Sequence, residues 1–89
     1  MKIVAELSLY PLKDNHIEPI LAFIKSLRGR AGLEIRTNQL STQISGDFEL
    51  VTGAVNDCLR ESMSGQGSTV LVAKYLNADL DLDEAPALD

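Results

Sequence analysis

The first residues after Met1 alternate between two kinds of position. One face carries Ile3, Ala5, Leu7 and Leu9, and the other carries Lys2, Val4, Glu6, Ser8 and Tyr10. A repeat of two residues predicts a β-strand over Lys2–Tyr10 with one buried, aliphatic face. Pro11 lacks a backbone donor, and we expect it to end the strand.

The next segment repeats its apolar residues at helical spacing. Its stripe consists of Ile17, Ile20, Leu21, Ile24 and Leu27. Asp14-Asn15 offers a helix cap, and Glu18 follows Asn15 at the distance that a capping box requires. We expect this helix to end between Gly29 and Gly32, with cations in its last turn.

A second helical stripe follows further along the chain. It consists of Leu50, Val51, Ala54, Val55, Cys58 and Leu59. Asp47 is a natural N-cap residue, and the segment Ser64–Gly67 is expected to end the helix. Gly53 lies inside the segment, where glycine is unfavourable, so we expect close packing of this helix against the sheet.

Three more segments indicate strands. Residues 33–38 alternate, residues 41–45 form a shorter polar strand that Gly46 is expected to break, and Thr69–Leu76 is strongly apolar. The order βαββαβ is typical of the α+β, ferredoxin-like arrangement, in which two helices cover one face of a four-stranded antiparallel sheet.

The opposite sheet face is expected to be uncovered. It would display Val4, Glu6, Ser8, Tyr10, Val70, Val72 and Leu76. Aliphatic residues on an open face favour a partner, and a small core favours oligomerisation. We therefore expect a homodimer through this face, with a larger homo-oligomer as the alternative.

Charge divides the chain into two parts. Thirteen acidic and eight basic residues give a net charge of −5. The last residues hold five of the acids and no base: Asp79, Asp81, Asp83, Glu84 and Asp89. Residues 1–78 are therefore neutral and form the expected domain, and 79–89 are expected to be a flexible acidic tail. A neutral domain lacks the basic surface that nucleic-acid binding requires.

Other classes of protein are disfavoured by what the sequence lacks. One cysteine and one histidine cannot make a structural zinc site, and no apolar run approaches the length of a membrane span. Glu6 interrupts the N-terminal apolar stretch and no small-residue cleavage pattern follows, so we expect no signal peptide and a cytoplasmic location. We expect neither a metal nor a cofactor.

Few residues suggest catalysis. His16 is expected to be an exposed residue at a helix start, and Cys58 falls on an apolar stripe, where a small core residue is the commoner role than a nucleophile. No pair of carboxylates converges in an obvious way. We therefore expect a protein that is not an enzyme.

Polar residues on the predicted strands are the stronger candidates for a site. Glu6, Ser8 and Tyr10 share one face, and Thr37-Asn38 precedes Ser41-Thr42-Gln43 across a hairpin. Hydroxyl, amide and carboxylate groups without a nucleophile suit hydrogen bonding to a small heterocycle or amide. The alternative is that these residues only fill exposed strand positions.

Two segments resemble one family. The segment 5–12, AELSLYPL, resembles the opening motif of YkoF-type thiamine- and hydroxymethylpyrimidine-binding proteins, and 37–47, TNQLSTQISGD, is similar to their second motif. The resemblance covers residues 2–78 and implies a ferredoxin-like fold. It also implies binding of thiamine or its pyrimidine moiety without turnover, in uptake or homeostasis.

The resemblance implies a set of residues near the ligand. These are Ser8, Tyr10, Asn38, Ser41 and Thr42, and Glu6 is a candidate acceptor for the amino group of an aminopyrimidine. One alternative is a regulatory or structural interaction module of the same fold that has lost ligand binding. Another is an enzyme of thiamine precursor metabolism.

Overall fold

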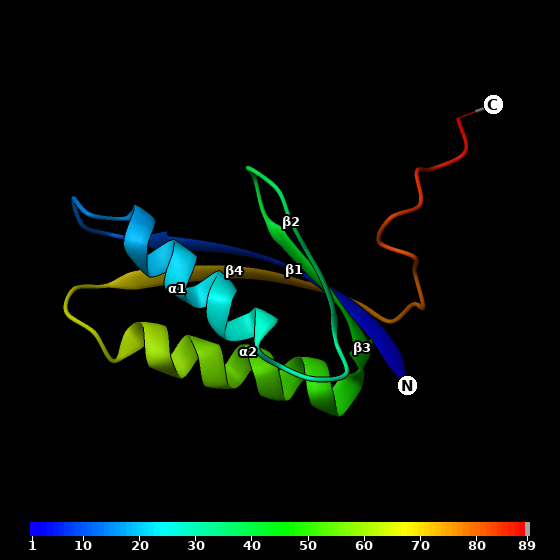
Figure 1. Ribbon diagram of the computed structural model, residues 1–89, viewed down its shortest axis with the longest axis horizontal. Coiled ribbons are helices and arrows are strands. Elements are labelled where there is room, and N and C mark those ends of the chain that lie inside the picture. Colours follow the sequence, from blue (N-terminus) through cyan, green and yellow to red (C-terminus); the bar gives the residue numbers. More distant parts are fainter. Residues whose placement is uncertain (89) are drawn as a thin grey trace.

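The computed structural model describes residues 1–88, and the predicted order of elements is confirmed in it. The elements are β1 (Lys2–Pro11), α1 (Ile17–Arg28), β2 (Glu34–Thr37), β3 (Thr42–Asp47), α2 (Phe48–Met63) and β4 (Thr69–Leu76). Helices α1 and α2 run side by side over one face of the sheet (Figure 1). Among the described residues, no helix is both long and apolar enough to cross a membrane.

The strands form one antiparallel sheet in the order β2-β3-β1-β4. Strand β1 is central: its residues Lys2 to Leu7 pair with β3, and its residues Val4 to Pro11 pair with β4. This is the α+β, ferredoxin-like arrangement that the sequence predicted. The N-terminal strand β1, whose alternation is the most regular, therefore has a hydrogen-bonded neighbour along each of its two edges.

The core lies between the sheet and the helices. The largest fully buried side chains are Leu7 from β1, Leu27 from α1, Ile44 from β3, and Val51 and Cys58 from α2. The predicted buried face of β1 is confirmed, since Ile3, Ala5, Leu7 and Leu9 all belong to this cluster. Aliphatic side chains on alternate strand positions therefore meet one stripe from each helix.

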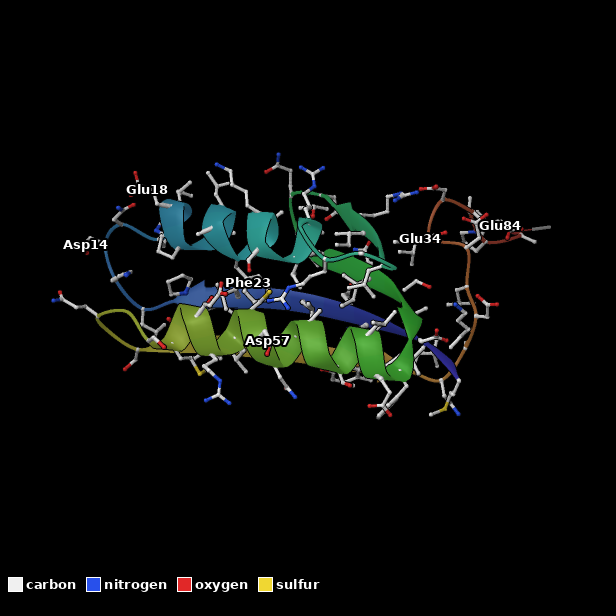
Figure 2. All side chains as sticks on the ribbon, turned by 60° about the horizontal axis from the view of Figure 1, so that its bottom comes forward. Asp14, Glu18, Phe23, Glu34, Asp57 and Glu84 are labelled. Carbon is white, nitrogen blue, oxygen red and sulfur yellow. The ribbon has the colours of Figure 1, made fainter. Side chains whose placement is uncertain are left out.

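The helical stripes differ in part from the prediction. Ile17 and Leu21 are about half exposed, whereas Phe23, which the predicted stripe omitted, is buried. Figure 2 shows Phe23 between the two helices and over β1. Leu50 of α2 is also exposed, while its other predicted neighbours are buried or partly buried. The apolar face of α1 is therefore centred on Phe23 and Leu27.

The start of α1 also differs from the prediction. His16 occupies the N-cap position and its side chain makes no capping hydrogen bond. The Asn15 amide instead donates to Glu18 Oε2 at 3.1 Å. The predicted capping box is therefore wrong, because the two side chains bond to each other rather than to the helix backbone. The predicted end is confirmed, since Gly29 is the C-cap residue.

Two glycines have the opposite roles from those predicted. Gly46 does not break β3 but lies inside it, opposite Ile3. A Cβ there would approach Leu33 Cδ2 to 2.9 Å and the Gly32 carbonyl oxygen to 3.1 Å, so this is the position of close packing. Gly53 is exposed, and a Cβ there would meet nothing within 4 Å.

The face opposite the helices is mostly exposed, as predicted. Tyr10, Val70, Val72 and Leu76 are each about half exposed on this face. Val4 is the exception, at 9% exposed. Its position on the central strand explains the burial, because Ser45 of β3 and Leu76 of β4 flank it on both sides. We call this surface the open face.

The two glycines make a matched test of the packing. Gly53→Ala should stabilise the protein by about 0.5–1 kcal/mol, because alanine restricts the unfolded chain and favours the helix without a new contact. Gly46→Ala should destabilise it by about 1–3 kcal/mol, because the new methyl group displaces the turn at Gly32. Chemical denaturation of both variants measures these changes. Equal effects of the two substitutions would contradict the close packing of Gly46 against Leu33 and Gly32.

Candidate functional site

A cavity of about 210 Å³ opens between α1, the end of β1 and the hairpin that joins β2 to β3. Its walls are the β1 residues 7–10, the hairpin residues 37–42, and Ile20, Phe23 and Ile24 of α1. The cavity exists because β1 is longer than its neighbour. Pairing of β1 with β3 ends at Leu7 and Thr42, whereas β1 continues beside β4 to Pro11.

Asn38 shapes the hairpin tip that overhangs this cavity. Its side-chain oxygen accepts hydrogen bonds from the backbone N–H of Leu40 at 2.8 Å and of Ser41 at 3.1 Å. Asparagine side chains commonly fold a tight turn in this way. The turn brings the Leu40 carbonyl toward β1, where Ser8 Oγ donates to it at 3.4 Å. The hairpin tip is therefore held over the end of β1 by side chains rather than by a continuous ladder.

Five of the six predicted site residues line the cavity. They are Ser8, Tyr10, Asn38, Ser41 and Thr42. Thr42 is buried, and its hydroxyl lies 3.1 Å from that of Thr37, so the two hydroxyls share one hydrogen bond inside the cavity wall. Tyr10 contributes to the lining from the end of β1, while its side chain is about half exposed on the open face.

Glu6 is the sixth predicted residue and does not line the cavity. One of its carboxylate oxygens accepts from Ser41 Oγ at 3.0 Å, and the other lies 3.4 Å from Lys74 Nζ. Gln43 Nε2 donates to the same serine oxygen at 2.7 Å. Glu6 therefore does not line the cavity itself, and it contacts the cavity wall through its hydrogen bond with Ser41.

Several lining residues were not predicted as part of a site. Phe23, Ile20 and Ile24 provide the apolar wall, and Leu9 provides further backbone surface, whereas Thr37 was already among the polar candidates of the hairpin. The sequence did contain a signal for the apolar wall. The apolar residues 20, 23, 24 and 27 lie three or four positions apart, which puts them on one face of α1. The stripe that was predicted omitted Phe23 and so missed the only aromatic ring that α1 contains.

A second hollow, of about 710 Å³, lies between the C-terminal segment and the sheet. Lys2, Arg36 and Ser45 line one side of it, and Asp79 and Asp83 line the other. Its walls are mainly charged and it is widely open to solvent, so it is a weaker candidate for a small apolar ligand than the first cavity. The C-terminal segment lies beside the end of the sheet in Figure 2.

Arg36 connects β2 to this segment. Its Nε and Nη2 atoms donate to the two carboxylate oxygens of Asp83, each at 2.6 Å. Paired parallel hydrogen bonds of this kind are the strongest that a guanidinium makes with a carboxylate. They hold the pKa of Asp83 below its ordinary value of 3.8, since the bonds favour the charged form.

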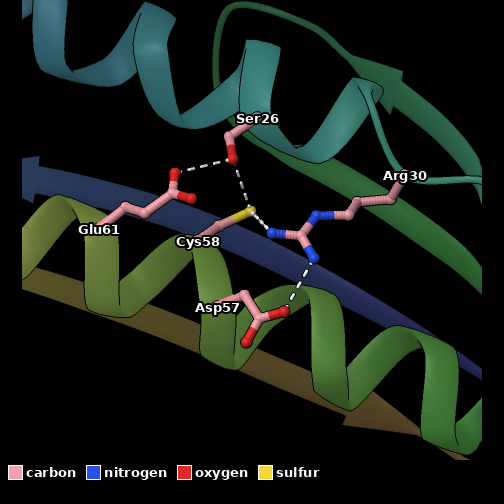
Figure 3. Close-up of polar contacts among 5 residues, drawn as sticks. All are labelled: Ser26, Arg30, Asp57, Cys58 and Glu61. Carbon is pink, nitrogen blue, oxygen red and sulfur yellow. Dashed lines mark hydrogen bonds and ion pairs between the residues drawn. The ribbon is translucent and has the colours of Figure 1, made fainter.

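Cys58 lies in a polar cluster between the helices, not at the cavity. It is 1% exposed, and its thiol donates to Ser26 Oγ at 3.2 Å (Figure 3). Ser26 in turn donates to Glu61 at 3.0 Å. Arg30 donates to Asp57 at 2.8 Å, which raises the pKa of Arg30, and it lies 3.9 Å from the sulfur. These contacts join α2 to α1 and to the turn after it.

Two other candidate features are the single histidine, His16, and the side chains that could bind a metal ion. His16 is exposed at the start of α1, where its Nδ1 lies 3.3 Å from the Asp14 carbonyl oxygen. Within residues 1–88, no group of three or more histidine, cysteine, aspartate or glutamate side chains is arranged to hold a metal ion.

The fold and the cavity define an α+β, ferredoxin-like domain with a small, mainly apolar recess, and solved structures share that fold. The sequence matches no protein-family model and no curated protein. Protein SP2199 of Streptococcus pneumoniae superposes with a TM-score of 0.82 at 17% identity, over 90% of each chain.

Two further structures extend this likeness. A Thermotoga maritima protein named for a proposed role in thiamine biosynthesis or salvage superposes with a TM-score of 0.81 at 16% identity, covering 93% of this chain and 92% of that one. A domain of unknown function, DUF77, from Bacillus cereus gives a TM-score of 0.74 at 10% identity, covering 93% of this chain and 85% of that one. At these identities the likeness shows a shared fold.

The ion pair at Arg36 predicts how the C-terminal segment responds to acid. Because the pKa of Asp83 is lowered, the pairing is complete above the ordinary value of about 3.8 and is lost as the pH falls through the lowered pKa. A carbon-13 NMR titration of the Asp83 carboxyl measures this directly. Arg36→Gln should return the pKa to its ordinary value, and the control Arg60→Gln should leave it lowered. An ordinary pKa in the unsubstituted protein would show that the pair does not form.

Proposed function

We propose that this chain is a non-enzymatic small-molecule-binding protein whose ligand is hydroxymethylpyrimidine, free or as part of thiamine. The observation that carries the proposal is the cavity at the end of β1. Five residues that the sequence motifs marked as close to a ligand line it together: Ser8, Tyr10, Asn38, Ser41 and Thr42. They come from two segments that are far apart in the sequence.

The size of the cavity supports a single ring. An apolar cavity of about 150 Å³ holds one benzene molecule, and pockets for drug-sized ligands occupy about 300–1,000 Å³. At about 210 Å³, the cavity suits one substituted six-membered ring. Thiamine has two rings, so only its pyrimidine ring would enter, and the thiazolium ring would remain outside.

The lining also suits an aminopyrimidine. Phe23 provides aromatic surface for a planar ring, and Ile20 and Ile24 add aliphatic contact. Hydroxyls of Ser8 and Thr42 and the amide of Asn38 provide donors and acceptors for ring nitrogens and an exocyclic amino group. Few polar groups in a mainly apolar recess are typical of a site that binds a small ring specifically.

The structural neighbour from Thermotoga maritima adds support of a different kind. Its name associates this fold with thiamine biosynthesis or salvage, and fold alone does not determine function. The proposal therefore depends on the cavity and the two motifs. We place the protein in the cytoplasm, in the uptake or homeostasis of thiamine or its precursor.

A paired substitution in the hairpin tests the ligand site. Ser41→Ala with Thr42→Ala should weaken hydroxymethylpyrimidine binding about 10–100-fold in isothermal titration calorimetry, because unpaired buried groups cost about 1–3 kcal/mol. The matched control, Thr52→Ala with Ser62→Ala on α2, should bind normally. Thermal unfolding checks that both variants are folded. Unchanged binding in the hairpin variant would remove the hairpin from the site.

A homodimer through the open face is the second part of the proposal. Tyr10, Val70, Val72 and Leu76 form an exposed row along β1 and β4. Burying such a row against a second copy removes apolar surface from water, which is the main driving force for association of identical chains. The same row is the observation that favours the alternative function, an interaction module without a ligand.

Light scattering at micromolar concentration tests the dimer. The unsubstituted protein should have twice the 9.7 kDa mass of the chain. Val72→Asp should shift it to the monomer mass, because a charge in an apolar interface must be desolvated without a partner. Leu21→Asp, which places the same charge on an exposed position of α1, should leave the mass unchanged. A monomer in the unsubstituted protein contradicts the dimer, and a dimer that binds no pyrimidine or thiamine compound favours the interaction module.

A further inference from the structure

The end of β1 carries backbone groups that no strand pairs. The β1–β3 register joins residues whose numbers sum to 49, from Lys2 with Asp47 to Leu7 with Thr42. If that register continued, Leu9 would lie opposite Leu40. The ladder stops before that pair, although β1 itself continues beside β4 as far as Pro11.

Alternation along β1 fixes the side to which Leu9 directs its main chain. The Leu12 N–H donates to the Ser68 carbonyl at 2.8 Å, on the β4 side, and the Met1 carbonyl accepts from the Phe48 N–H at 2.9 Å, on the β3 side. Since successive residues of an antiparallel strand direct their N–H and C=O groups to opposite sides, odd-numbered residues of β1 face β3. The N–H and C=O of Leu9 therefore face the hairpin tip and the cavity.

The hairpin does not satisfy these two groups because its own groups are engaged elsewhere. The Leu40 N–H, which would donate to the Leu9 carbonyl in a continued ladder, donates to Asn38 Oδ1. The Leu40 carbonyl accepts from the Ser8 hydroxyl. Over residues 1–88, the backbone hydrogen bonds between the strands and the loops include none to Leu9.

The surroundings of Leu9 make this arrangement costly without a ligand or water. Leu9 is 7% exposed and lines the cavity with Phe23. Buried backbone donors and acceptors are nearly always paired in folded proteins. An unpaired donor and acceptor side by side in an apolar recess are therefore suited to a partner that enters the cavity.

We propose that the N–H and C=O of Leu9 hold the edge of the ligand, and that the ligand is a planar ring with a hydrogen-bond acceptor next to a donor. The ring acceptor receives the Leu9 N–H, and the donor gives a hydrogen bond to the Leu9 carbonyl. This inference rests on the proposed function for the location of the site. It adds the recognition element, which is main chain and so leaves no signature in the side chains of the sequence.

The free protein gives the first test. In amide hydrogen exchange followed by NMR, the Leu9 amide should exchange at least tenfold faster than the amides of Leu7 and Tyr10, whose N–H groups belong to the β3 and β4 ladders. Saturation with 4-amino-5-hydroxymethyl-2-methylpyrimidine should slow the Leu9 amide to their rate. A Leu9 amide that is already as slow as that of Leu7 in the free protein overturns the inference.

Substitution of Asn38 tests why the N–H and C=O of Leu9 have no partner in the hairpin. Asn38→Ala releases the Leu40 N–H, which can then donate to the Leu9 carbonyl, and the Leu40 carbonyl can accept the Leu9 N–H beside the Ser8 hydroxyl. The amides of Leu9 and Leu40 should both exchange at least tenfold more slowly than in the unsubstituted protein, without ligand. The matched control, Asn56→Ala on α2, should leave both rates unchanged. A role of Asn38 in ligand contact alone would not slow either amide, so unchanged rates in Asn38→Ala overturn its assignment as the residue that keeps the ladder open.

Two more probes separate this inference from the proposed function. The 4-dimethylamino analogue of the pyrimidine lacks the donor, and it should bind at least tenfold more weakly. The cyclic amide 2-pyridone has an adjacent donor and acceptor but is not a thiamine precursor, and at millimolar concentration it should slow the Leu9 amide. Protection by 2-pyridone without pyrimidine binding supports the inference and contradicts the proposed ligand. Pyrimidine binding that leaves the Leu9 amide unprotected supports the proposed ligand and overturns the inference, as does the absence of protection by every probe.

Discussion

The alternation of β1 is the constraint on which the other features depend. Its odd-numbered side chains form the centre of the core, and its backbone pairs with β3 on one edge and β4 on the other. A shift of one residue would bring Glu6 and Ser8 into the core and Leu7 to the surface, so burial fixes the register strongly. The helices, the open face and the cavity then take their positions from this one strand.

The cavity is a consequence of unequal strand lengths. A sheet in which β3 matched β1 would pair every backbone group and leave no recess beneath the hairpin. Here the ladder ends at Leu7 and Thr42, and α1 covers the remaining end of β1 with Ile20 and Phe23. Incomplete pairing costs some stability, because buried backbone groups prefer a partner. Binding sites commonly carry such a local cost, which the rest of the fold offsets.

The features that the sequence predicted are those that depend on periodicity. The strict alternation in β1 and the helical stripes were sufficient to identify the elements and their order. The end of β1 and the hairpin tip could also be placed together, because the ferredoxin-like topology makes β1 and β3 neighbours. This is why Ser8 and Thr42, from two separate motifs, line one cavity.

The features that could not be predicted depend on contacts between segments. Gly46 and Gly53 look alike in sequence, and only the approach of Leu33 and Gly32 shows which one must lack a side chain. The position at which the β1–β3 ladder ends likewise depends on contacts between segments and could not be predicted from the sequence. An asparagine before a turn is a recognisable signal, but its effect on Leu40 and Leu9 depends on how far the hairpin reaches along β1.

The open face and the cavity are linked through one short chain of polar groups. Ser41 lines the cavity and donates to Glu6, which pairs with Lys74 on the open face. This ion pair is exposed in the single chain, where water screens it. A second chain packed on the open face would remove that water and strengthen the attraction between the two charges. A stronger hold on Glu6 by Lys74 changes the acceptor available to Ser41. Association through the open face and binding in the cavity would therefore act on the same serine, although they occur on opposite sides of the sheet.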